Sequence, residues 1–475
     1  MADVQRSVAA ELDRIAPVLD ALGERFADAG HELALVGGPV RDAMLGRHHN
    51  DLDFTTSARP EETERLLKGW ADAIWDMGRG FGTIGCRKGP WQVEITTYRS
   101  EAYDPDSRKP EVDFGDTLDG DLGRRDFTVN AMAVRVPGRE VEDPYGGIVD
   151  LSHRVLRTPG RPEDSFSDDP LRMMRAARFA AQLGFTVDPA VVEAMRAMAT
   201  RSEIISAERV RYELVKLVSA PWPRRGLELL VETGLAAYVL PELPALRLER
   251  DEHNRHKDVY EHTLTVLEQA IDLERSRHGE DAEPDFVGRF AALMHDVGKP
   301  KTRRFVDDGT VTFHHHDVVG AKITRKRMKA LRFSNDQVDA VSKLVELHLR
   351  FHGYGSGEWT DSAVRRYVRD AGDQLERLHI LTRADCTTRN KRKADRLRRT
   401  YDDLETRIER LSEEEELAAI RPDLDGAQIM EILGIPPGRD VGRAYKFLLE
   451  LRMDHGPQSE DAARDALLAW WPGED

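Results

Sequence analysis

The chain has 475 residues, of which 86 are acidic and 70 are basic, and its formal net charge at pH 7 is −16. This charge argues against a protein that binds nucleic acid through its global electrostatics, although local basic segments can still do so. The length predicts about three or four domains or subdomains. We find no apolar run that would span a bilayer and no signal-peptide pattern, and the two cysteines, Cys86 and Cys386, offer no disulfide framework. We therefore expect a protein of the reducing cytoplasm.

The first motif is LALVGGPVRDAMLGRHHNDLDFTT, residues 33–56. Its apolar start, LALV, predicts a buried strand that Gly37 and Gly38 end, and residues 40–45 predict the first turns of a helix. Backbone N–H groups at such a turn are ready donors to phosphate, and Arg41 adds a fixed positive charge. The turn therefore indicates a site for a triphosphate.

The end of this segment, DLDFTT, predicts a second strand. Because side chains alternate along a strand, Asp51 and Asp53 share one face and Leu52 takes the other. Paired hard oxygen ligands are what Mg²⁺ needs to bridge nucleotide phosphates and an attacking hydroxyl. A later strand, WQVEITTYR, carries Glu94, which is either a third carboxylate for the metal or a solvated strand glutamate.

The glycine turn, the basic residue and the spaced carboxylates together resemble the signature of the nucleotidyltransferase superfamily that includes DNA polymerase β. More narrowly, they resemble the class II CCA-adding tRNA nucleotidyltransferases and their poly(A) polymerase relatives. RRDFTVNAMAV resembles the second motif of that family, which implies that Arg124 or Arg125 contacts the nucleotide while Asp126 and Asn130 hold the site together. The polar segment before it, residues 100–123, predicts a mobile loop.

SDDPLRMMRAARFAAQLGF predicts a helix that begins near Ser167 and has Asp169 and Arg172 on one face. A carboxylate accepts hydrogen bonds and a guanidinium donates them. Cytosine and adenine each present an amino donor beside a ring-nitrogen acceptor, whereas uracil and guanine present a carbonyl beside a ring N–H. The pair can therefore accept C and A and reject U and G without a nucleic-acid template.

The template motif of the family is usually Glu-Asp-x-x-Arg, and this chain has Asp168 in the first place. By resemblance, the base is read by the two residues named above. Arg175 and Arg178 drift around the helix, and we expect them to serve phosphates, tRNA or packing. ISAERVRYELVKLV matches the next helical motif of the family, and there we expect structural roles for Glu208, Arg209 and Glu213.

The second half of the chain carries histidines and aspartates that recur along predicted helices, including the adjacent pair His295 and Asp296. This pattern resembles the HD superfamily of metal-dependent phosphohydrolases. Imidazole and carboxylate are the usual ligands for one or two divalent ions that activate water on a phosphoester. The resemblance implies a divalent transition metal, a phosphohydrolase activity and six ligands: His262, His295, Asp296, His316, His348 and Asp385.

From about residue 150 onward, amphipathic helical patterns replace the strand patterns. Two basic helical segments, ITRKRMKALRF and TRNKRKADRLRRT, either track a tRNA backbone or form solvated faces. The last segment resembles a helical module that follows the HD region in this family, and it fits an interaction or dimerisation element equally well. We predict four parts: a catalytic head at 1–150, a helical neck and body for nucleotide selection and tRNA binding at 151–248, an HD-type helical domain at 249–400, and a helical tail at 401–475.

Together these expectations predict an α+β protein with a polymerase β-like head, a small mixed sheet covered by helices, followed by an all-α neck, body and HD-type tail. We predict a template-independent enzyme that adds C and A from CTP and ATP to the 3′ end of tRNA, with no membrane partner and no particular oligomeric state. Asp51 and Asp53, with Glu94, would hold two Mg²⁺ ions. One ion would lower the pKa of the ribose hydroxyl and the other would clamp the triphosphate, so that pyrophosphate leaves.

Three alternatives stay open. A poly(A) polymerase, an A-adding enzyme or a CC-adding enzyme would use the same head, and the segment 100–123 is part of what separates them. From a different class, the chain is an HD phosphohydrolase that acts on nucleotide or cyclic phosphates and has a degenerate head. A catalytically inactive RNA-binding protein would need broken motifs, and the motifs here are intact.

Overall fold

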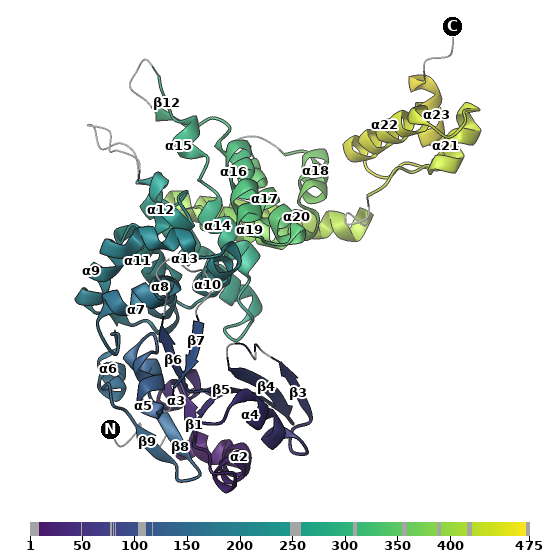
Figure 1. Cartoon of the computed structure of the whole chain (residues 1–475). Coiled ribbons are helices and arrows are strands. Elements are labelled where there is room, and N and C mark those ends of the chain that lie inside the picture. Colours follow the sequence, from purple (N-terminus) through teal and green to yellow (C-terminus); the bar gives the residue numbers. More distant parts are fainter. Residues whose placement is uncertain are drawn as a thin grey trace. The chain divides into compact units, whose positions relative to one another are not determined.

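The computed structural model describes residues 9–471, with gaps at 49, 77, 79, 81, 103–110, 116, 248–257, 307–310, 354–358, 387–390 and 416–419. The chain forms two compact units, residues 1–241 and 242–475. The first contains a mixed sheet with helices, and the second is almost entirely helical (Figure 1). The α+β fold class that the sequence predicts is therefore confirmed.

The sheet of the first unit has seven strands in the order β3-β4-β5-β2-β1-β8-β9. Strands β2 and β5 run parallel, and the other neighbouring pairs are antiparallel. The strands are β1 (Leu33–Val36), β2 (Asp51–Thr56), β3 (Ala73–Asp76), β4 (Thr83–Lys88), β5 (Trp91–Thr97), β8 (Ala133–Val136) and β9 (Glu140–Glu142). The accompanying helices are α2 (Ala16–Asp28), α3 (Gly38–Met44), α4 (Pro60–Leu67), α5 (Leu118–Gly123), α6 (Gly147–His153) and the short 3₁₀ turn η2 (Thr128–Asn130).

The core of this unit lies between the sheet and its helices. Helix α2 packs on β1 and β8 with a buried face that includes Leu22 and Phe26. Strand β1 is buried along its whole length, as its apolar sequence predicts. In β2, Leu52 is buried while Asp51 and Asp53 are exposed, so the predicted alternation between the two faces holds at these residues.

The segment 100–123, which we predicted to be a mobile loop, contains regular structure. Strands β6 (Arg99–Ala102) and β7 (Glu111–Phe114) pair antiparallel, and α5 follows them. Residues 103–110 lie outside the described residues. The described part of this segment is therefore a β-hairpin and a helix.

Helices form the remainder of the first unit. They are α7 (Pro162–Asp168), α8 (Leu171–Leu183), α9 (Pro189–Met198), α10 (Ala207–Val218), α11 (Pro223–Glu232), α12 (Ala236–Val239) and the 3₁₀ helix η3 (Ala199–Ile204), with two short strands, β10 (Val155–Leu156) and β11 (Thr186–Val187). The predicted single helix from Ser167 is wrong, because α7 ends and α8 begins around Asp169. Asp169 is extended, with φ −144° and ψ 102°. The cause is Pro170, since a proline disfavours the helical conformation in the residue before it.

The second unit begins with the 3₁₀ turn η4 (Pro244–Leu246). Its main helices are α13 (Val259–His278), α14 (Phe286–Met294), α15 (Lys299–Thr302), α16 (His316–Ala330), α17 (Asn335–Leu347), α18 (Asp361–Ala371), α19 (Leu375–Ala384) and α20 (Lys391–Glu415). Shorter elements are η5 (Arg350–Gly353), η6 (Gly372–Gln374), β12 (Arg304–Phe305) and β13 (Val311–Thr312). A Cβ atom on Gly298 would collide with the backbone carbonyl of His316, so this glycine lets the turn after α14 contact α16.

The C-terminal helices α21 (Gly426–Leu433), α22 (Arg439–His455) and α23 (Glu460–Trp470) share a small apolar core of their own. Two of the predicted domain boundaries, after residues 150 and 400, fall inside helices α6 and α20, and the third, after residue 248, lies outside the described residues. The four-part division therefore stays a prediction. Among the described residues, no helix combines the length and the apolar character that a membrane crossing requires.

Candidate functional site

Three carboxylates lie on one face of two neighbouring strands. In the parallel pair β2–β5, Asp53 is directly opposite Glu94, and Asp51 is opposite Gln92. The protein around Asp53 removes it partly from water and raises its pKa, and the charge of Asp51 adds to this effect. The pKa of Glu94 is raised by burial first and then by both aspartates. These carboxylates therefore repel one another, and a cation would relieve the repulsion.

The turn between β1 and α3 brings a guanidinium close to the backbone. Gly37 has φ 73°, a conformation that favours glycine, and a Cβ atom there would lie only 2.9 Å from Arg125 Nη1. The Arg125 side chain also pairs with Asp121 at 3.2 Å. Because Gly37 has no Cβ atom, the Arg125 guanidinium can lie directly beside the turn that we predicted to bind phosphate.

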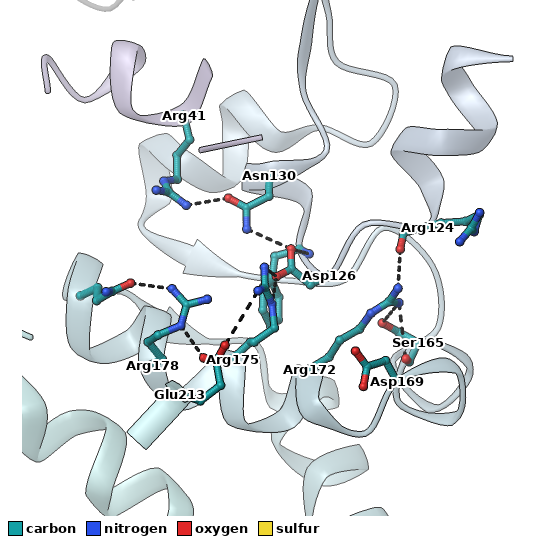
Figure 2. Close-up of polar contacts among 12 residues, drawn as sticks. Arg41, Arg124, Asp126, Asn130, Ser165, Asp169, Arg172, Arg175, Arg178 and Glu213 are labelled. Atoms are coloured by element: carbon teal, nitrogen blue, oxygen red, sulfur yellow. Dashed lines mark hydrogen bonds and ion pairs between the residues drawn. The ribbon is translucent and has the colours of Figure 1, made fainter. Parts of the chain in front are cut away.

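A chain of hydrogen bonds connects the head to helix α8 (Figure 2). Arg41 Nη1 donates to Asn130 Oδ1 at 2.7 Å, and Asn130 Nδ2 donates to Asp126 Oδ1 at 2.9 Å. Arg175 Nε donates to Asp126 Oδ2 at 2.7 Å. Although burial alone would raise the pKa of Asp126, the charge of Arg175 and these hydrogen bonds lower it to about 2. Asp126 and Asn130 thus link two segments of the cavity wall.

Arg41 is more strongly engaged by its neighbours than we expected. Besides Asn130, it contacts both carboxylate oxygens of Asp42, through Nε at 2.9 Å and Nη2 at 2.8 Å. The guanidinium is buried with only 8% of the residue exposed. Any phosphate at Arg41 would therefore meet a guanidinium whose orientation is already fixed.

Arg178 and Glu213 form a buried ion pair. Arg178 Nε donates to Glu213 Oε2 at 2.5 Å, and the two side chains are 7% and 2% exposed. The guanidinium carbon of Arg178 also lies 4.0 Å from the ring centroid of Phe179. Arg178 and Phe179 line the cavity described below, and the buried ion pair fits the structural role that we expected for Glu213.

The two residues that we predicted to read the base are both held by protein contacts, and Figure 2 shows those of Arg172. Asp169 Oδ1 accepts from the backbone N–H of Leu171 at 3.0 Å, and Arg209 Nη2 donates to Oδ2 at 2.7 Å. Arg172 donates to Ser165 Oγ at 2.9 Å and to the backbone carbonyl of Arg124 at 2.6 Å. The acceptor and the donor are therefore pre-oriented, although they do not share one helix.

These side chains surround a cavity of about 470 Å³. Its predicted members are Gly37, Gly38, Arg41, Asp53, Arg125, Asp126, Asn130, Asp169, Arg172, Arg175 and Arg178. Seven basic and three acidic side chains line it in a chain whose net charge is −16. Among the described residues, Asp51, Glu94 and Arg124 do not line this cavity. The excess of positive charge suits a triphosphate.

The cavity also contains Leu171, Phe179, Arg209 and Lys216, which we did not predict as site residues. Two of them come from α10, and a sequence signal for them exists. Arg209, Glu213 and Lys216 are spaced by four and three residues, so they share one face of a helix. A row of charged residues at this spacing predicts a helix whose charged face lies against a polar site.

In the second unit, the structure brings the six predicted HD side chains together. In three of the histidines, Nδ1 lies within hydrogen-bond distance of the backbone carbonyl three residues earlier: 2.7 Å for His295, 2.8 Å for His316 and 2.7 Å for His348. Such a contact assigns the proton to Nδ1 and leaves the lone pair of Nε2 for a metal.

The donor atoms form two groups of three, each compact enough to hold one metal ion: His262, His295 and Asp385, and Asp296, His316 and His348. In the described part of the chain, these are the groups of three or more such donors. The Nε2 atoms of His295 and His348 are buried and make no hydrogen bond there. Burial lowers the pKa of His348 to about 4, so this imidazole is neutral at pH 7, as a metal ligand must be. The residues therefore fit divalent metal ions.

Three family models match the chain. Residues 33–157 match the poly A polymerase head domain, residues 184–246 match the probable RNA and SrmB-binding site of polymerase A, and residues 259–390 match the HD domain. The first match contains the carboxylates and the glycine turn, and the third contains all six HD side chains.

Curated relatives agree with these models. The chain is 34% identical over 445 residues to the A-adding tRNA nucleotidyltransferase of Deinococcus radiodurans, which covers 92% of this chain and 95% of the relative. It is 41% identical over 229 residues to the CCA-adding enzyme of Levilactobacillus brevis, but this match covers only 48% of the chain and 55% of the relative.

Solved structures share the fold. The CCA-adding enzyme of Bacillus stearothermophilus in complex with CTP superposes with a TM-score of 0.66 at 26% identity, over 94% of this chain and 95% of that one. The Thermotoga maritima CCA-adding enzyme complexed with tRNA has a TM-score of 0.61 at 18% identity, over 98% of both chains, and supports the fold alone. The chain is therefore a nucleotidyltransferase and belongs to the family of tRNA nucleotidyltransferases that contains the A-adding and CCA-adding enzymes.

Proposed function

We propose that this enzyme adds two C residues and one A residue to the 3′ end of tRNA, using CTP and ATP and no nucleic-acid template. The observation that carries the proposal is the basic cavity that is lined by a fixed carboxylate, Asp169, and a fixed guanidinium, Arg172, together with Asp53. A base that offers an amino donor beside a ring-nitrogen acceptor is complementary to this pair.

The carboxylate face supports Mg²⁺ binding by Asp51 and Asp53, with Glu94 as the third candidate. Mg²⁺ is commonly held by one or two carboxylates together with the phosphates of the substrate, so a closed cage of protein ligands is not needed. When bound, two such ions supply positive charge to the α-phosphate and to the attacking hydroxyl. The mutual repulsion of the three carboxylates favours a cation at this place.

The remaining steps follow from the cavity residues. Arg41, Arg125 and the glycine turn would bind the triphosphate, and the pair described above would bind the base. The ribose 3′ oxygen of the tRNA then bonds to the α-phosphorus while the bond to the β-phosphate oxygen breaks. Pyrophosphate leaves, and the hydroxyl proton passes to water.

A second candidate is an enzyme that adds only the final A. It is favoured by the relative from D. radiodurans, which is an A-adding enzyme and matches nearly the whole chain. The test uses three tRNAs that end at the discriminator base, at C74 or at C75, each incubated with one nucleotide at a time. We expect C to be added to the first two and A only to the third. Addition of A to the third without any addition of C to the others would establish the A-adding function instead.

We also propose that the HD unit is a metal-dependent phosphohydrolase. Two buried imidazoles present Nε2 without a hydrogen-bond partner in the described part of the chain, and the two donor groups contain histidine and aspartate, which suit a divalent transition metal. The test compares hydrolysis of a phosphomonoester and of a 2′,3′-cyclic phosphate by the full chain, with added Mn²⁺ or Ni²⁺.

The matched variant for this test carries His295→Ala and Asp296→Ala together. It should lose any metal-dependent hydrolysis and keep nucleotide addition, because the two sites use different residues. Hydrolysis that survives in this variant would remove the HD site from consideration, and loss of nucleotide addition would show that the two activities are not separable.

A further inference from the structure

A second, smaller cavity adjoins the one described above. It has a volume of about 300 Å³ and shares a wall with the larger cavity, formed by Arg125, Asp169 and Arg172. Its other residues are Thr96, Arg99, Asp121 and Arg124, which do not line the larger cavity. Four guanidinium groups and two carboxylates therefore surround this small space, and one of the carboxylates, Asp121, is paired with Arg125.

The small cavity borders the strand that carries Glu94. Thr96 stands two residues after Glu94 on β5, so its side chain is on the same face as the carboxylate, and it is paired in register with Thr55 of β2. Arg99 is fixed at the start of β6, where its Nη2 donates to Thr83 Oγ1 at 3.0 Å. The small cavity therefore lies next to the C-terminal end of β5, after the position of Glu94. The glycine turn, in contrast, comes directly after β1.

Nucleotide transfer requires two substrates at one set of carboxylates. The larger cavity has room and charge for the triphosphate, and the attacking 3′ hydroxyl must approach roughly in line with the departing pyrophosphate. The end of the acceptor strand is single-stranded and carries one phosphodiester per nucleotide. A guanidinium fork matches the oxygens of such a phosphate. Because the net charge of the chain is −16, contacts to RNA phosphates must come from local groups of this kind.

We propose that the small cavity binds a phosphodiester of the tRNA acceptor end, and that Arg99, one of the two arginines that line only this cavity, contacts the phosphate. The proposal rests on the nucleotide-adding function proposed above. The shared wall then separates the two substrates: Arg172 and Asp169 face the incoming base from one cavity and the acceptor strand from the other.

The test measures the full-length enzyme with Arg99→Ala, with Arg99→Lys and with Lys216→Ala as the matched control, since Lys216 is a cation of the larger cavity only. For each, KM is determined separately for CTP and for tRNA, and tRNA binding is titrated at several salt concentrations without nucleotide. For Arg99→Ala we expect KM for tRNA to rise about tenfold, as for the loss of one charge-assisted hydrogen bond. The salt slope of tRNA binding should fall by about 0.7, the value for one single-strand phosphate contact. Lysine should restore part of both.

The control should show the opposite pattern, with a higher KM for CTP and an unchanged salt slope for tRNA. If Arg99→Ala raises KM for CTP and leaves tRNA binding unchanged, the small cavity belongs to the triphosphate and the proposal is wrong. No change in either substrate also overturns it. Failure of the unaltered enzyme to extend tRNA would instead refute the proposed function, and the binding titration would still decide the role of Arg99.

Discussion

Arg209 and Asp169 are joined by a hydrogen bond of 2.7 Å between Nη2 and Oδ2, which connects helix α10 to the break between α7 and α8. The backbone N–H of Leu171 holds the other oxygen of the same carboxylate. Asp169 is therefore fixed at both oxygens while each oxygen keeps a lone pair for a further donor. In the proposed function, this pre-oriented carboxylate accepts a hydrogen bond from the amino group of the incoming base.

Replacement of Arg209 tests this orientation. In Arg209→Ala, Asp169 keeps the contact from the backbone N–H of Leu171 but loses the one at Oδ2, so we expect the preference for CTP over UTP to fall roughly tenfold, the lower end of what one base contact contributes. The measurement is kcat/KM for all four nucleotides. Lys216→Ala removes an equal charge from the same helix and cavity, and it should weaken all four alike. Equal losses for all four nucleotides in Arg209→Ala would show that Arg209 contributes only charge.

Removal of the acceptor itself should have a larger effect on base selection. In Asp169→Ala, we expect discrimination against UTP and GTP to fall by about ten- to a hundredfold, or roughly 1–3 kcal/mol. Arg41→Ala should weaken all four nucleotides equally, because a phosphate contact carries no base information. The same kcat/KM series measures both variants. A uniform loss in Asp169→Ala would mean that this residue does not select the nucleotide.

The region around Asp169 also shows how far the sequence predicts the site. The glycine turn and the strand that carries the paired carboxylates follow from local patterns, since each depends on periodicity or on a short motif. The set of six HD side chains was instead implied by the resemblance to the HD superfamily, because these residues are distant in the sequence. The break at Asp169 was not predicted, because we interpreted the apolar period of the following helix as continuing backward across Pro170. The proline itself is the local sign of the break, since it disfavours the helical conformation in the residue before it. The contact from Arg209 joins residues that are 40 positions apart. No local pattern predicts such a contact, because it depends on how α10 packs against α8.

The carboxylates that we propose to bind Mg²⁺ should be essential for activity and unnecessary for folding. Asp53→Asn and Asp51→Asn keep the side-chain shape and remove one charge, so nucleotide addition should fall to less than a few per cent while the fold persists. Because desolvation and Asp51 already raise the pKa of Asp53, its charge is unfavourable in the folded enzyme, and Asp53→Asn should have an equal or higher Tm. Thermal unfolding without Mg²⁺ measures this. A clearly lower Tm would show that Asp53 stabilises the fold.

Asp126 should stabilise the enzyme in a pH-dependent way. Its pKa is about 2, below the ordinary value of 3.8, so its contribution is complete above about pH 4 and disappears as the pH falls toward 2. Asp126→Asn should therefore cost roughly 2–3 kcal/mol at pH 7 and about half of that at pH 3. Urea unfolding of both proteins at several pH values checks this. A cost that is the same at pH 3 and pH 7 would mean that the ion pair with Arg175 is not its source.

The most direct test of the proposed function is the sequence of the 3′ end that the enzyme produces. A tRNA transcript that ends at its discriminator base is incubated with the full-length enzyme, Mg²⁺ and all four nucleotides together, and the product ends are sequenced. We predict an extension of three residues, C, C and A, in that order and with no further growth. A tail of many A residues, an unextended transcript, or extension that includes U or G would contradict the account.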